Sequence, residues 1–351
     1  MGEENLAAVL HAAEDLRLEK WPLPEPKENE VLVRMARVGI CGSDVHFLKH
    51  GRIGDFVVKK PMVIGHESSG VVVRCGKAVT SLKPGDKVAL EPGVPCRHCS
   101  YCKEGIYNVC PKVSFFACPP TSGTMARYFC HPEDFCFKLP DNVSLEEGAL
   151  LEPLAVGVHS CRRGGVGLGS KVLVIGAGPI GLVTLLTAKA MGAATVILTD
   201  VVEQRLEVAK KIGADGTLLT GKLNEEEIVK QIWNLFGGDG PDVALDCSGT
   251  EPGQRLAFLA PKPRGVAVMV GVGPPEIKAP LLSACLREVD IKTIFRYCND
   301  YPAALAMLAS GKVNVKQLIT HNYKLEEALQ AFQTARSGVG NPIKIMVHCS
   351  Q

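Results

Sequence analysis

The sequence Val172-Leu173-Val174-Ile175-Gly176-Ala177-Gly178-Pro179-Ile180-Gly181 joins a fully apolar run to a glycine-rich turn. A short, wholly apolar run predicts a strand of a parallel sheet that is covered on both faces. Residues 182–191 then have a helical pattern, so the G-x-G-x-x-G spacing of Gly176, Gly178 and Gly181 lies between a strand and a helix. In that context the glycines permit a tight turn and let a pyrophosphate approach the helix N-terminus. The stretch therefore predicts the start of a dinucleotide-binding fold.

A second expected strand, residues 195–199, ends in Asp200, which lies 24 residues after Gly176. A carboxylate near this position binds the adenosine ribose hydroxyls in dinucleotide-binding folds. Further strands are expected at residues 217–219, 242–246, 266–270 and 291–295, and helices at residues 203–212, 225–236 and 251–259. Together they predict an α/β fold of the Rossmann type, a doubly wound six-stranded parallel sheet. An α/β domain whose glycine turn binds no nucleotide is the alternative interpretation.

A cysteine, a histidine and a glutamate form a candidate metal site. Cys41 begins the segment Cys41-Gly42-Ser43-Asp44-Val45-His46, and His66 and Glu67 lie in Gly65-His66-Glu67-Ser68-Ser69-Gly70. Thiolate, imidazole and carboxylate groups bind zinc well, and a catalytic zinc needs three protein ligands. Because neighbours on a strand point to opposite faces, His66 and Glu67 can share a metal only where the backbone is irregular. The alternative is a buried apolar thiol beside a hydrogen-bonded surface pair.

Four cysteines follow with the spacing Cys96-x2-Cys99-x2-Cys102-x7-Cys110. Four thiolates this close together can fold a small lobe, at about residues 93–112, around a tetrahedral zinc. Such a site has no free coordination position, so it is predicted to be structural. His98 is a competing ligand that breaks the regular spacing, and four incidental cysteines are the alternative interpretation.

Composition narrows the class of protein. The 351 residues, 46% hydrophobic and 22% charged, suffice for two globular domains. A formal net charge of +2 gives no reason to expect a nucleic acid or an anionic membrane as partner. Met1–Asn5 is acidic and lacks an apolar segment, and Val172–Ala188 is short and broken by glycines, so neither a secretory signal nor a membrane span is expected. We therefore expect a cytoplasmic protein whose 14 cysteines are thiols and metal ligands.

The remaining sequence predicts a mostly-β, loop-rich domain at residues 1–156, to which residues 296–351 return. Its best strand is expected at residues 31–38, and helices at residues 302–309 and 325–335 precede a closing strand at residues 342–347.

Two positions in the connections between the domains carry polar groups of interest. Residues 146–156 are expected to form two short helical pieces joined at Pro153, with Glu152 among apolar neighbours. A lone carboxylate there is ordinarily a cap or an ion-pair partner. Arg296 and Tyr297 follow the sixth strand, where an interdomain salt bridge or a packing contact is the ordinary expectation.

These motifs resemble zinc-containing alcohol dehydrogenases of the medium-chain dehydrogenase/reductase family. Gly65-His66-Glu67-x2-Gly70-x5-Gly76-x2-Val79 is similar to the family's zinc signature, and Cys41-Gly42-Ser43-Asp44-x-His46 to its upstream ligand segment. The sorbitol (polyol, L-iditol 2-) dehydrogenase branch is resembled in Gly51-Arg52-Ile53, Leu151-Glu152-Pro153 and Phe295-Arg296-Tyr297-Cys298-Asn299. The resemblance covers essentially the whole chain. It implies a GroES-like zinc catalytic domain at residues 1–156 and 296–351 and a Rossmann NAD-binding domain at residues 157–295.

The resemblance also implies a role for each candidate residue. The expected ligands of the catalytic zinc are Cys41, His66 and Glu67, and those of the structural zinc are Cys96, Cys99, Cys102 and Cys110. The expected polyol or water contacts are Glu152, Arg296 and Tyr297, with Ser43 and His46 passing the proton towards solvent. The expected cofactor contacts are Gly176, Gly178, Ile180, Gly181, Asp200, Arg205, Val270, Gly271, Val272 and Phe295. Classical alcohol dehydrogenases have cysteine at the position of Glu152, so it stays open whether Glu67 or Glu152 touches the zinc.

The resemblance implies interconversion of a polyol of the sorbitol, xylitol or L-iditol type and its ketose. The implied cofactors are NAD and two zinc ions per chain, and the implied assembly is a homotetramer. Asp200 favours NAD over NADP, because the NADP phosphate removes a hydroxyl donor and places like charges together. Another zinc alcohol dehydrogenase or a threonine dehydrogenase is the alternative enzyme. A non-catalytic binding relative would be expected to lose metal ligands, and all of them are present.

Overall fold

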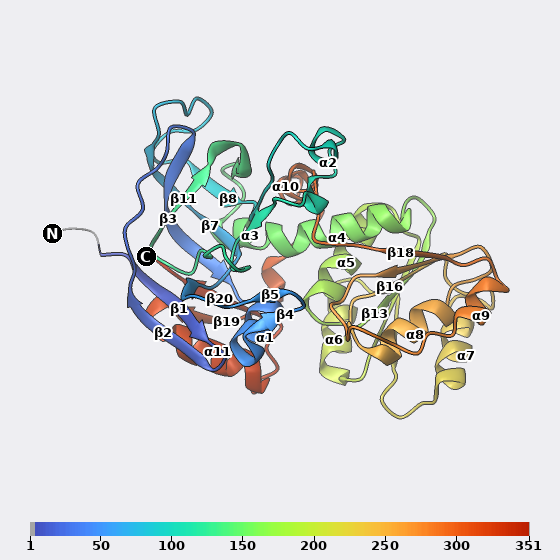
Figure 1. The fold of residues 1–351 in the computed structure, drawn as a ribbon. Helices are drawn as coiled ribbons and strands as arrows, with labels where there is room; N and C mark the ends of the chain where they lie inside the picture. The colour runs from blue at the N-terminus through green and yellow to red at the C-terminus, as the bar shows by residue number, and fades with distance from the viewer. Residues whose placement is uncertain (1–3, 351) are drawn as a thin grey trace. The chain divides into compact units, whose positions relative to one another are not determined.

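The computed structural model describes residues 4–350 and divides the chain into two compact units (Figure 1). One unit comprises Met1–Glu152 and Val315–Gln351, and the other comprises Pro153–Asn314. Residues 1–3, on which the expectation of no secretory signal partly rests, lie outside the described residues. The sequence predicts the return to the first domain at residue 296, whereas residues 296–314 pack with the second unit.

The first unit is mostly β-structure. Its strands are β1 (Leu6–Ala12), β2 (Asp15–Lys20), β3 (Glu30–Gly39), β4 (Arg52–Ile53), β5 (Phe56–Val57), β6 (Met62–Val63), β7 (Glu67–Cys75), β8 (Lys87–Leu90), β9 (Gly93–Val94), β10 (Ser114–Phe115), β11 (Tyr128–Pro132), β12 (Cys136–Lys138), β19 (Ile319–Lys324) and β20 (Lys344–His348). Its helices are α1 (Gly42–His50), α2 (Ser100–Lys103), α3 (Leu145–Ala149) and α11 (Ala328–Ser337), with 3-10 turns at Tyr107–Val109, Glu133–Phe135, Lys316–Leu318 and Leu325–Glu327.

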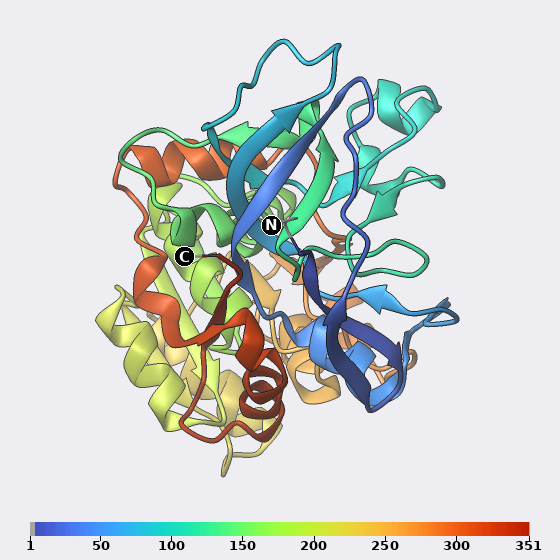
Figure 2. The same ribbon diagram turned by 90° about the vertical axis from the view of Figure 1, so that its left-hand side faces the viewer.

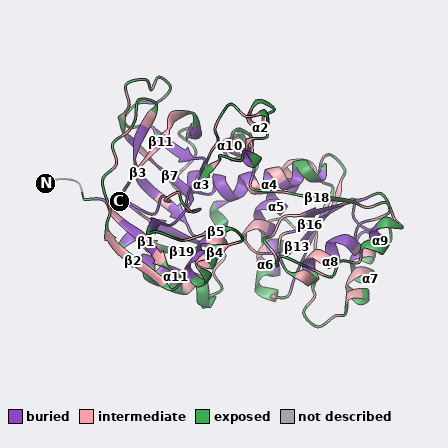
Figure 3. Cartoon of the chain, in the orientation of Figure 1, coloured by how far each residue is buried: buried purple, intermediate pink, exposed green. Residues whose placement is uncertain are grey.

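A seven-stranded sheet organises the first unit, with the order β12-β8-β7-β3-β20-β19 and with β11 also paired to β3 (Figure 2). The long central strands β3 and β7 are largely buried, as Figure 3 shows. β3 contributes Val31, Val33, Met35 and Val38 to the apolar core, whereas β7 begins with the buried polar residues Glu67, Ser68 and Ser69. The C-terminal strand β20 pairs antiparallel with β3, which brings the last segment of the chain beside the first long strand. The expected strands at residues 31–38 and 342–347 are thereby confirmed, whereas β19 was not predicted.

The second unit is a Rossmann fold. Its strands are β13 (Lys171–Ile175), β14 (Thr195–Asp200), β15 (Gly216–Leu219), β16 (Val243–Asp246), β17 (Val266–Met269) and β18 (Asp290–Thr293), all parallel in the order β15-β14-β13-β16-β17-β18. Its helices are α4 (Leu151–Gly164), α5 (Pro179–Ala190), α6 (Glu203–Lys211), α7 (Glu225–Leu235), α8 (Glu251–Leu259), α9 (Leu281–Cys285) and α10 (Tyr301–Ala309). The first two residues of α4, Leu151 and Glu152, belong to the first unit. This order confirms the predicted six-stranded, doubly wound sheet.

Alternating side chains of the central strand β13 contact helices on both faces of this sheet. Leu173 belongs to one apolar cluster with Ile232 of α7 and Leu256 of α8. Val174 points to the other face, where its side chain lies against Gly181 of α5. The sheet is therefore covered on both faces, which explains why β13 is apolar throughout.

The break between α3 and α4 corrects one prediction. The two helices meet at Leu150, and Pro153 lies inside the first turn of α4. Proline is tolerated there because the first N–H groups of a helix have no intrahelical acceptor. Within residues 4–350, no helix has both the length and the apolarity needed to cross a bilayer.

Candidate metal and cofactor sites

The candidate ligands Cys41, His66 and Glu67 converge in the first unit. One ligand atom from each lies within 4.8 Å of the other two. Cys41 precedes the first residue of α1, and Glu67 is the first residue of β7. The predicted ligand set is thus brought together, with His66 and Glu67 buried and Cys41 partly exposed.

An irregular backbone lets two consecutive residues face one place. Gly65 has φ +92°, and a Cβ on it would lie 2.8 Å from Cγ1 of Val38. This left-handed conformation favours glycine, and it turns the chain just before His66. Because β7 begins only at Glu67, His66 does not follow the alternation of the strand. The backbone is therefore irregular at His66, as two consecutive residues require if both are to bind one metal.

Asp44 connects the two halves of this cluster. Its Oδ2 accepts a hydrogen bond from the backbone N–H of Cys41 at 3.0 Å, and its Oδ1 accepts one from Gly65 at 3.3 Å. Oδ1 also lies 3.3 Å from Nδ1 of His66. The Asp44 side chain is 1% exposed. One buried carboxylate thereby orients the imidazole and leaves its Nε2 as the ligand atom.

The charges around the cluster suit a bound cation. Burial lowers the pKa of His66, but the charges of Asp44 and Cys41 outweigh burial and raise it well above its ordinary value. Burial also lowers the pKa of Lys344, and the charges of Glu67, Cys41 and Glu152 raise it above its ordinary value. Four acidic groups thus surround one lysine and one histidine.

This donor set fits zinc. A thiolate, an imidazole and a carboxylate with excess negative charge match the ligands and the open position of a catalytic zinc site. When bound, zinc acts as a Lewis acid that stabilises an alkoxide or a hydroxide.

The four cysteines of the lobe form a second metal-type cluster. Their sulfurs lie within 4.8 Å of one another, with Sγ of Cys99 and Cys102 3.4 Å apart. The backbone N–H groups of His98 and Cys99 lower the pKa of Cys96 to about 6. Four converging thiols fit a closed tetrahedral zinc, and His98 is not part of this cluster among the residues that the structure describes.

Neighbouring side chains hold this lobe against the sheet of the first unit. The Tyr107 hydroxyl donates to Oε1 of Glu91 at 2.6 Å. The Arg97 guanidinium donates to both carboxylate oxygens of Asp134 and lies over the ring of Phe135.

The glycine turn of the second unit has the predicted geometry. Gly176 has φ +95°, and a Cβ on Gly181 would lie 1.8 Å from the carbonyl oxygen of Gly176. Only glycine allows α5 to pass this close to the end of β13. Gly178 precedes α5, and a Cβ on it would meet no described atom within 4 Å. The space at Gly178 is therefore open to a ligand, as the dinucleotide interpretation requires.

Asp200 ends β14 beside this turn. Its Oδ2 accepts a hydrogen bond from the backbone N–H of Ala177 at 2.7 Å, and its Oδ1 accepts one from Val202 at 2.8 Å. Each oxygen keeps a further acceptor position for a ribose hydroxyl. Arg205, one turn into α6, is exposed.

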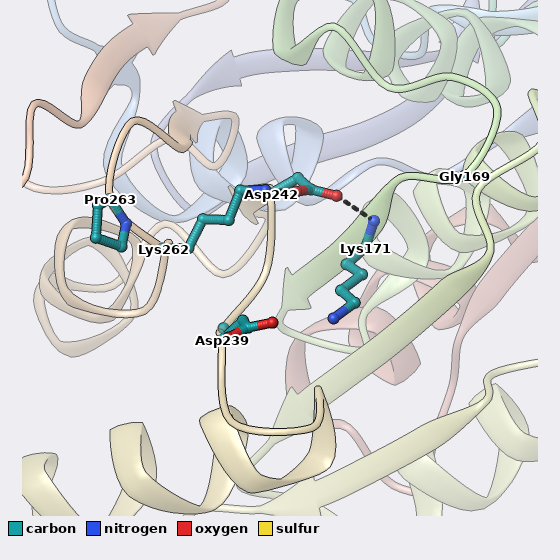
Figure 4. Close-up of a pocket in the computed structure, with 7 residues that line it drawn as sticks. Gly169, Lys171, Asp239, Asp242, Lys262 and Pro263 are labelled. Atoms are coloured by element: carbon teal, nitrogen blue, oxygen red, sulfur yellow. Dashed lines mark hydrogen bonds and ion pairs between the residues drawn. The ribbon is translucent and has the colours of Figure 1, made fainter.

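A pocket of about 430 Å³ lies elsewhere in the second unit (Figure 4). Lys171, Asp239, Asp242 and Lys262 line it at the amino end of β13, whereas the glycine turn follows the carboxyl end of that strand. Oδ2 of Asp242 accepts a hydrogen bond from the backbone N–H of Lys171 at 2.7 Å, and Oδ1 forms an ion pair with Nζ of Lys262 at 2.5 Å. Because ligands of such sheets bind at the carboxyl edge, this pocket is not the dinucleotide site.

Two family models and known relatives match this chain. The model of the alcohol dehydrogenase GroES-like domain matches residues 27–141, and that of the zinc-binding dehydrogenase matches residues 179–310. The sorbitol dehydrogenase of Mus musculus is 53% identical over 346 residues, which cover 99% of this chain and 96% of the relative. The chain belongs to the sorbitol dehydrogenase family of zinc-binding dehydrogenases.

Solved structures of other dehydrogenases have the same fold as this family member. An oxidoreductase of unknown specificity from Escherichia coli is 37% identical with a TM-score of 0.94, covering 99% of this chain and 100% of its own. An alcohol dehydrogenase from E. coli CFT073 complexed with NADH is 26% identical, with a TM-score of 0.91. The match covers 99% of this chain and 100% of that dehydrogenase.

The other family-implied residues of the first unit lie on two helices. Ser43 and His46 are three residues apart on α1, at a spacing that places them on one side of the helix. His46 packs against His50 with ring centroids 4.6 Å apart, and partial burial lowers the pKa of His46. Glu152 is buried in the first turn of α4, near enough to Lys344 for its charge to raise the pKa of that lysine.

The other family-implied residues of the second unit follow the carboxyl ends of its strands. Val270 and Gly271 both donate backbone hydrogen bonds to the carbonyl of Asp246, while Val272 is 78% exposed. The sixth strand ends at Thr293, not at the predicted residue 295, so Phe295 lies beyond it.

Arg296 and Tyr297 differ in their surroundings. Arg296 has φ +55°, and its guanidinium carbon lies 4.5 Å from the centroid of the Phe295 ring. Tyr297 is buried, and its ring centroid lies 5.6 Å from that of Tyr301. Asp300 holds this segment, because its carboxylate pairs with His159 and Arg162 of α4.

Sequence reasoning missed two residues that support the metal cluster. Asp44 was visible in the Cys41-Gly-Ser-Asp segment, where an acid three residues after a helix start signals contact with the preceding backbone. Lys344 had no local signal, because a single lysine in a strand is ordinarily solvated.

Proposed function

We propose that this protein oxidises a secondary hydroxyl of a polyol to a ketone, and runs the reverse reaction, with hydride transfer to and from NAD. Polyols of the sorbitol, xylitol and L-iditol type are the substrates. The converging cluster of Cys41, His66 and Glu67 carries the proposal, together with the near full-length similarity to sorbitol dehydrogenases. Cys41, His66 and Glu67 would hold the zinc, which would supply a Lewis acid for the substrate oxygen.

The side chains of the chain have separate tasks in this reaction. Glu152, buried in the first turn of α4, serves as the carboxylate base acting through water. Ser43 and His46 on α1 pass the proton towards solvent, a role that suits His46 because it is exposed. Arg296 and Tyr297 contact the hydroxyl groups of the polyol. The nicotinamide supplies the hydride chemistry, and the Rossmann unit orients it.

A turnover panel tests this function. Purified zinc-loaded protein is assayed with sorbitol, xylitol, fructose, ethanol and threonine, each with NAD(H) and NADP(H). We expect the highest kcat/KM for a polyol or its ketose with the NAD couple. Preference for ethanol or threonine would replace the polyol assignment with another zinc alcohol or threonine dehydrogenase. Zinc binding without any turnover would identify a binding protein.

The roles of the two carboxylates need a separate experiment. Glu67→Gln is expected to lose zinc affinity, because Glu67 belongs to the converging ligand cluster. Glu152→Gln is expected to keep zinc and to lose turnover. If instead Glu152→Gln releases zinc and Glu67→Gln does not, the two roles are exchanged.

We further propose that the protein is a cytoplasmic homotetramer. The edge strand β18 has β17 as its one neighbour among the described strands, and its Ile291 is 41% exposed. Leu282 of α9 and Leu286, which follows α9 and precedes β18 in the chain, are 72% and 78% exposed. An unpaired edge with exposed leucines supports pairing with a second copy. All 14 cysteines are free thiols, as suits a reducing compartment.

Light scattering tests this assembly. Wild-type protein should have the mass of four chains, and Leu282→Glu with Leu286→Glu should reduce it, whereas a monomeric wild type would refute the proposal. Cell fractionation tests the compartment.

A further inference from the structure

A buried ion pair joins the metal cluster to the C-terminal strand. Nζ of Lys344 lies 2.7 Å from both Oε1 and Oε2 of Glu67, and the two side chains are 4% and 0% exposed. Nζ also donates to the carbonyl oxygen of Ile40 at 3.2 Å. The three N–H groups of the ammonium therefore all have acceptors, which a lysine this deeply buried requires.

The register of the sheet builds this contact. Glu67 of β7 pairs with Gly39 of β3, and Gly39 pairs with Met346 of β20. Lys344 lies two residues before Met346, so its side chain is on the same face of the sheet as that of Glu67. Between them, a Cβ on Gly39 would lie 2.2 Å from Oε2 of Glu67. The absence of a side chain at Gly39 leaves the space through which the carboxylate reaches the ammonium.

The position of this pair matters for the metal because Glu67 is one of the converging ligands. Both oxygens of its carboxylate are already engaged by a cation that the chain itself supplies. A metal ion at the cluster must share Glu67 with Lys344, and the ammonium repels the metal across a short, buried distance. Without a metal, the same ammonium compensates a carboxylate that would otherwise be a buried, unpaired charge.

We propose that Lys344 is a positioning residue that controls how tightly the catalytic site holds its metal. It neutralises Glu67 in the metal-free protein, so that the empty site stays folded, and it weakens the attraction of Glu67 for the metal. The zinc of this site is thereby kept exchangeable. The inference rests on the metal-binding role of the cluster and not on the identity of the substrate.

The test compares Lys344→Met, Lys344→Arg and wild type as full-length proteins, each metal-free and zinc-loaded. Lys344→Met should lower the Tm of the metal-free protein. Zinc binding should restore most of this lost Tm, because the positive charge of zinc then replaces the missing charge of the lysine. Its zinc affinity, from competition with a chelator, should rise by about tenfold or more. Lys344→Arg should stay near wild type. Lys316→Met is the matched control, because Lys316 is a half-exposed lysine paired with Glu147 in the same unit.

Three outcomes would contradict the proposal. An equal loss of Tm in the metal-free and zinc-loaded forms would make Lys344 a structural residue only. A weaker zinc affinity would mean that the lysine supports metal binding and does not oppose it. If Lys344→Met does not fold alone, Glu67→Gln with Lys344→Met removes both charges and should be more stable, when metal-free, than Glu67→Gln, which leaves the lysine unpaired. A less stable double variant would contradict charge compensation. None of these readouts uses turnover, so failure of the proposed substrate class would leave them unchanged.

Discussion

Oδ1 of Asp44 lies 3.3 Å from Nδ1 of His66, inside a cluster whose three ligands come from two separate segments of the chain. Asp44 also accepts the backbone N–H groups of Cys41 and Gly65. Asp44→Asn keeps the size of the side chain but removes its charge and presents N–H groups to the imidazole. We expect zinc affinity to fall by about 10- to 100-fold, as for other residues that orient metal-bound histidines. Chelator competition measures this, and an unchanged affinity would show that Asp44 only holds the backbone.

Zinc content distinguishes the two metal clusters. Because the two ligand sets are separate, elemental analysis should give close to two zinc ions per chain. Cys41→Ser should remove one zinc and leave the fold intact. Cys99→Ser should also lower the Tm, because α2 of the lobe has no buried residue and a bound zinc would contribute to the folding free energy there. A wild-type content of one zinc would refute the four-cysteine site.

Two glycines of the same turn should respond differently to alanine. Gly181→Ala should lower both the Tm and the cofactor affinity, because its Cβ would overlap the carbonyl oxygen of Gly176. Gly178→Ala should leave the Tm near wild type, since its Cβ meets no described atom within 4 Å, but it should block the pyrophosphate. Thermal melts with and without NADH provide the comparison. If Gly178→Ala binds NADH as tightly as wild type, the pyrophosphate does not bind at Gly178.

Asp200 should determine the choice between NAD and NADP. The backbone N–H groups of Ala177 and Val202 fix the carboxylate of Asp200, which the 2′-phosphate of NADP would repel. Such like charges correspond to a preference for NAD over NADP of about a hundredfold or more in kcat/KM. Asp200→Ala should narrow or invert the ratio of kcat/KM for the two cofactors. Arg205→Ala is the matched control and should not favour NADP. Faster turnover of the wild type with NADP at equal low concentration would show the role of Asp200 to be wrong.

His131 should make stability depend on pH. Burial lowers the pKa of His131 from 6.5 to about 3, and its Nε2 donates to the carbonyl oxygen of Glu91 at 2.8 Å. Between these values the unfolded chain binds a proton that the folded chain does not bind. The free energy of unfolding therefore decreases as pH falls below 6.5, by up to about 1.4 kcal/mol per pH unit from this group.

A variant isolates this contribution. His131→Gln keeps an N–H donor without a titrating ring, so its free energy of unfolding should fall less steeply than that of wild type on acidification. Denaturant titrations between pH 7 and pH 4 compare the two proteins. Equal slopes would mean that His131 is protonated in the folded state.

Much of this protein follows from local sequence. The strand at residues 172–175 and the glycine turn after it predicted the Rossmann unit, because an apolar strand and the freedom of glycine act over a few residues. The four cysteines were predicted as one cluster for the same reason, since their spacing alone holds the sulfurs near one another.

Tertiary structure decided what depends on pairing between distant segments. Whether Cys41 and His66 meet rests on the left-handed turn at Gly65 and on the carboxylate of Asp44, not on their spacing. Lys344 lies 277 residues from Glu67 and meets it only because β20 and β7 flank the same strand, β3. No local pattern marks such a lysine as buried. The free-energy cost of burying its charge is compensated by Glu67, and only the register of the sheet brings that partner to it.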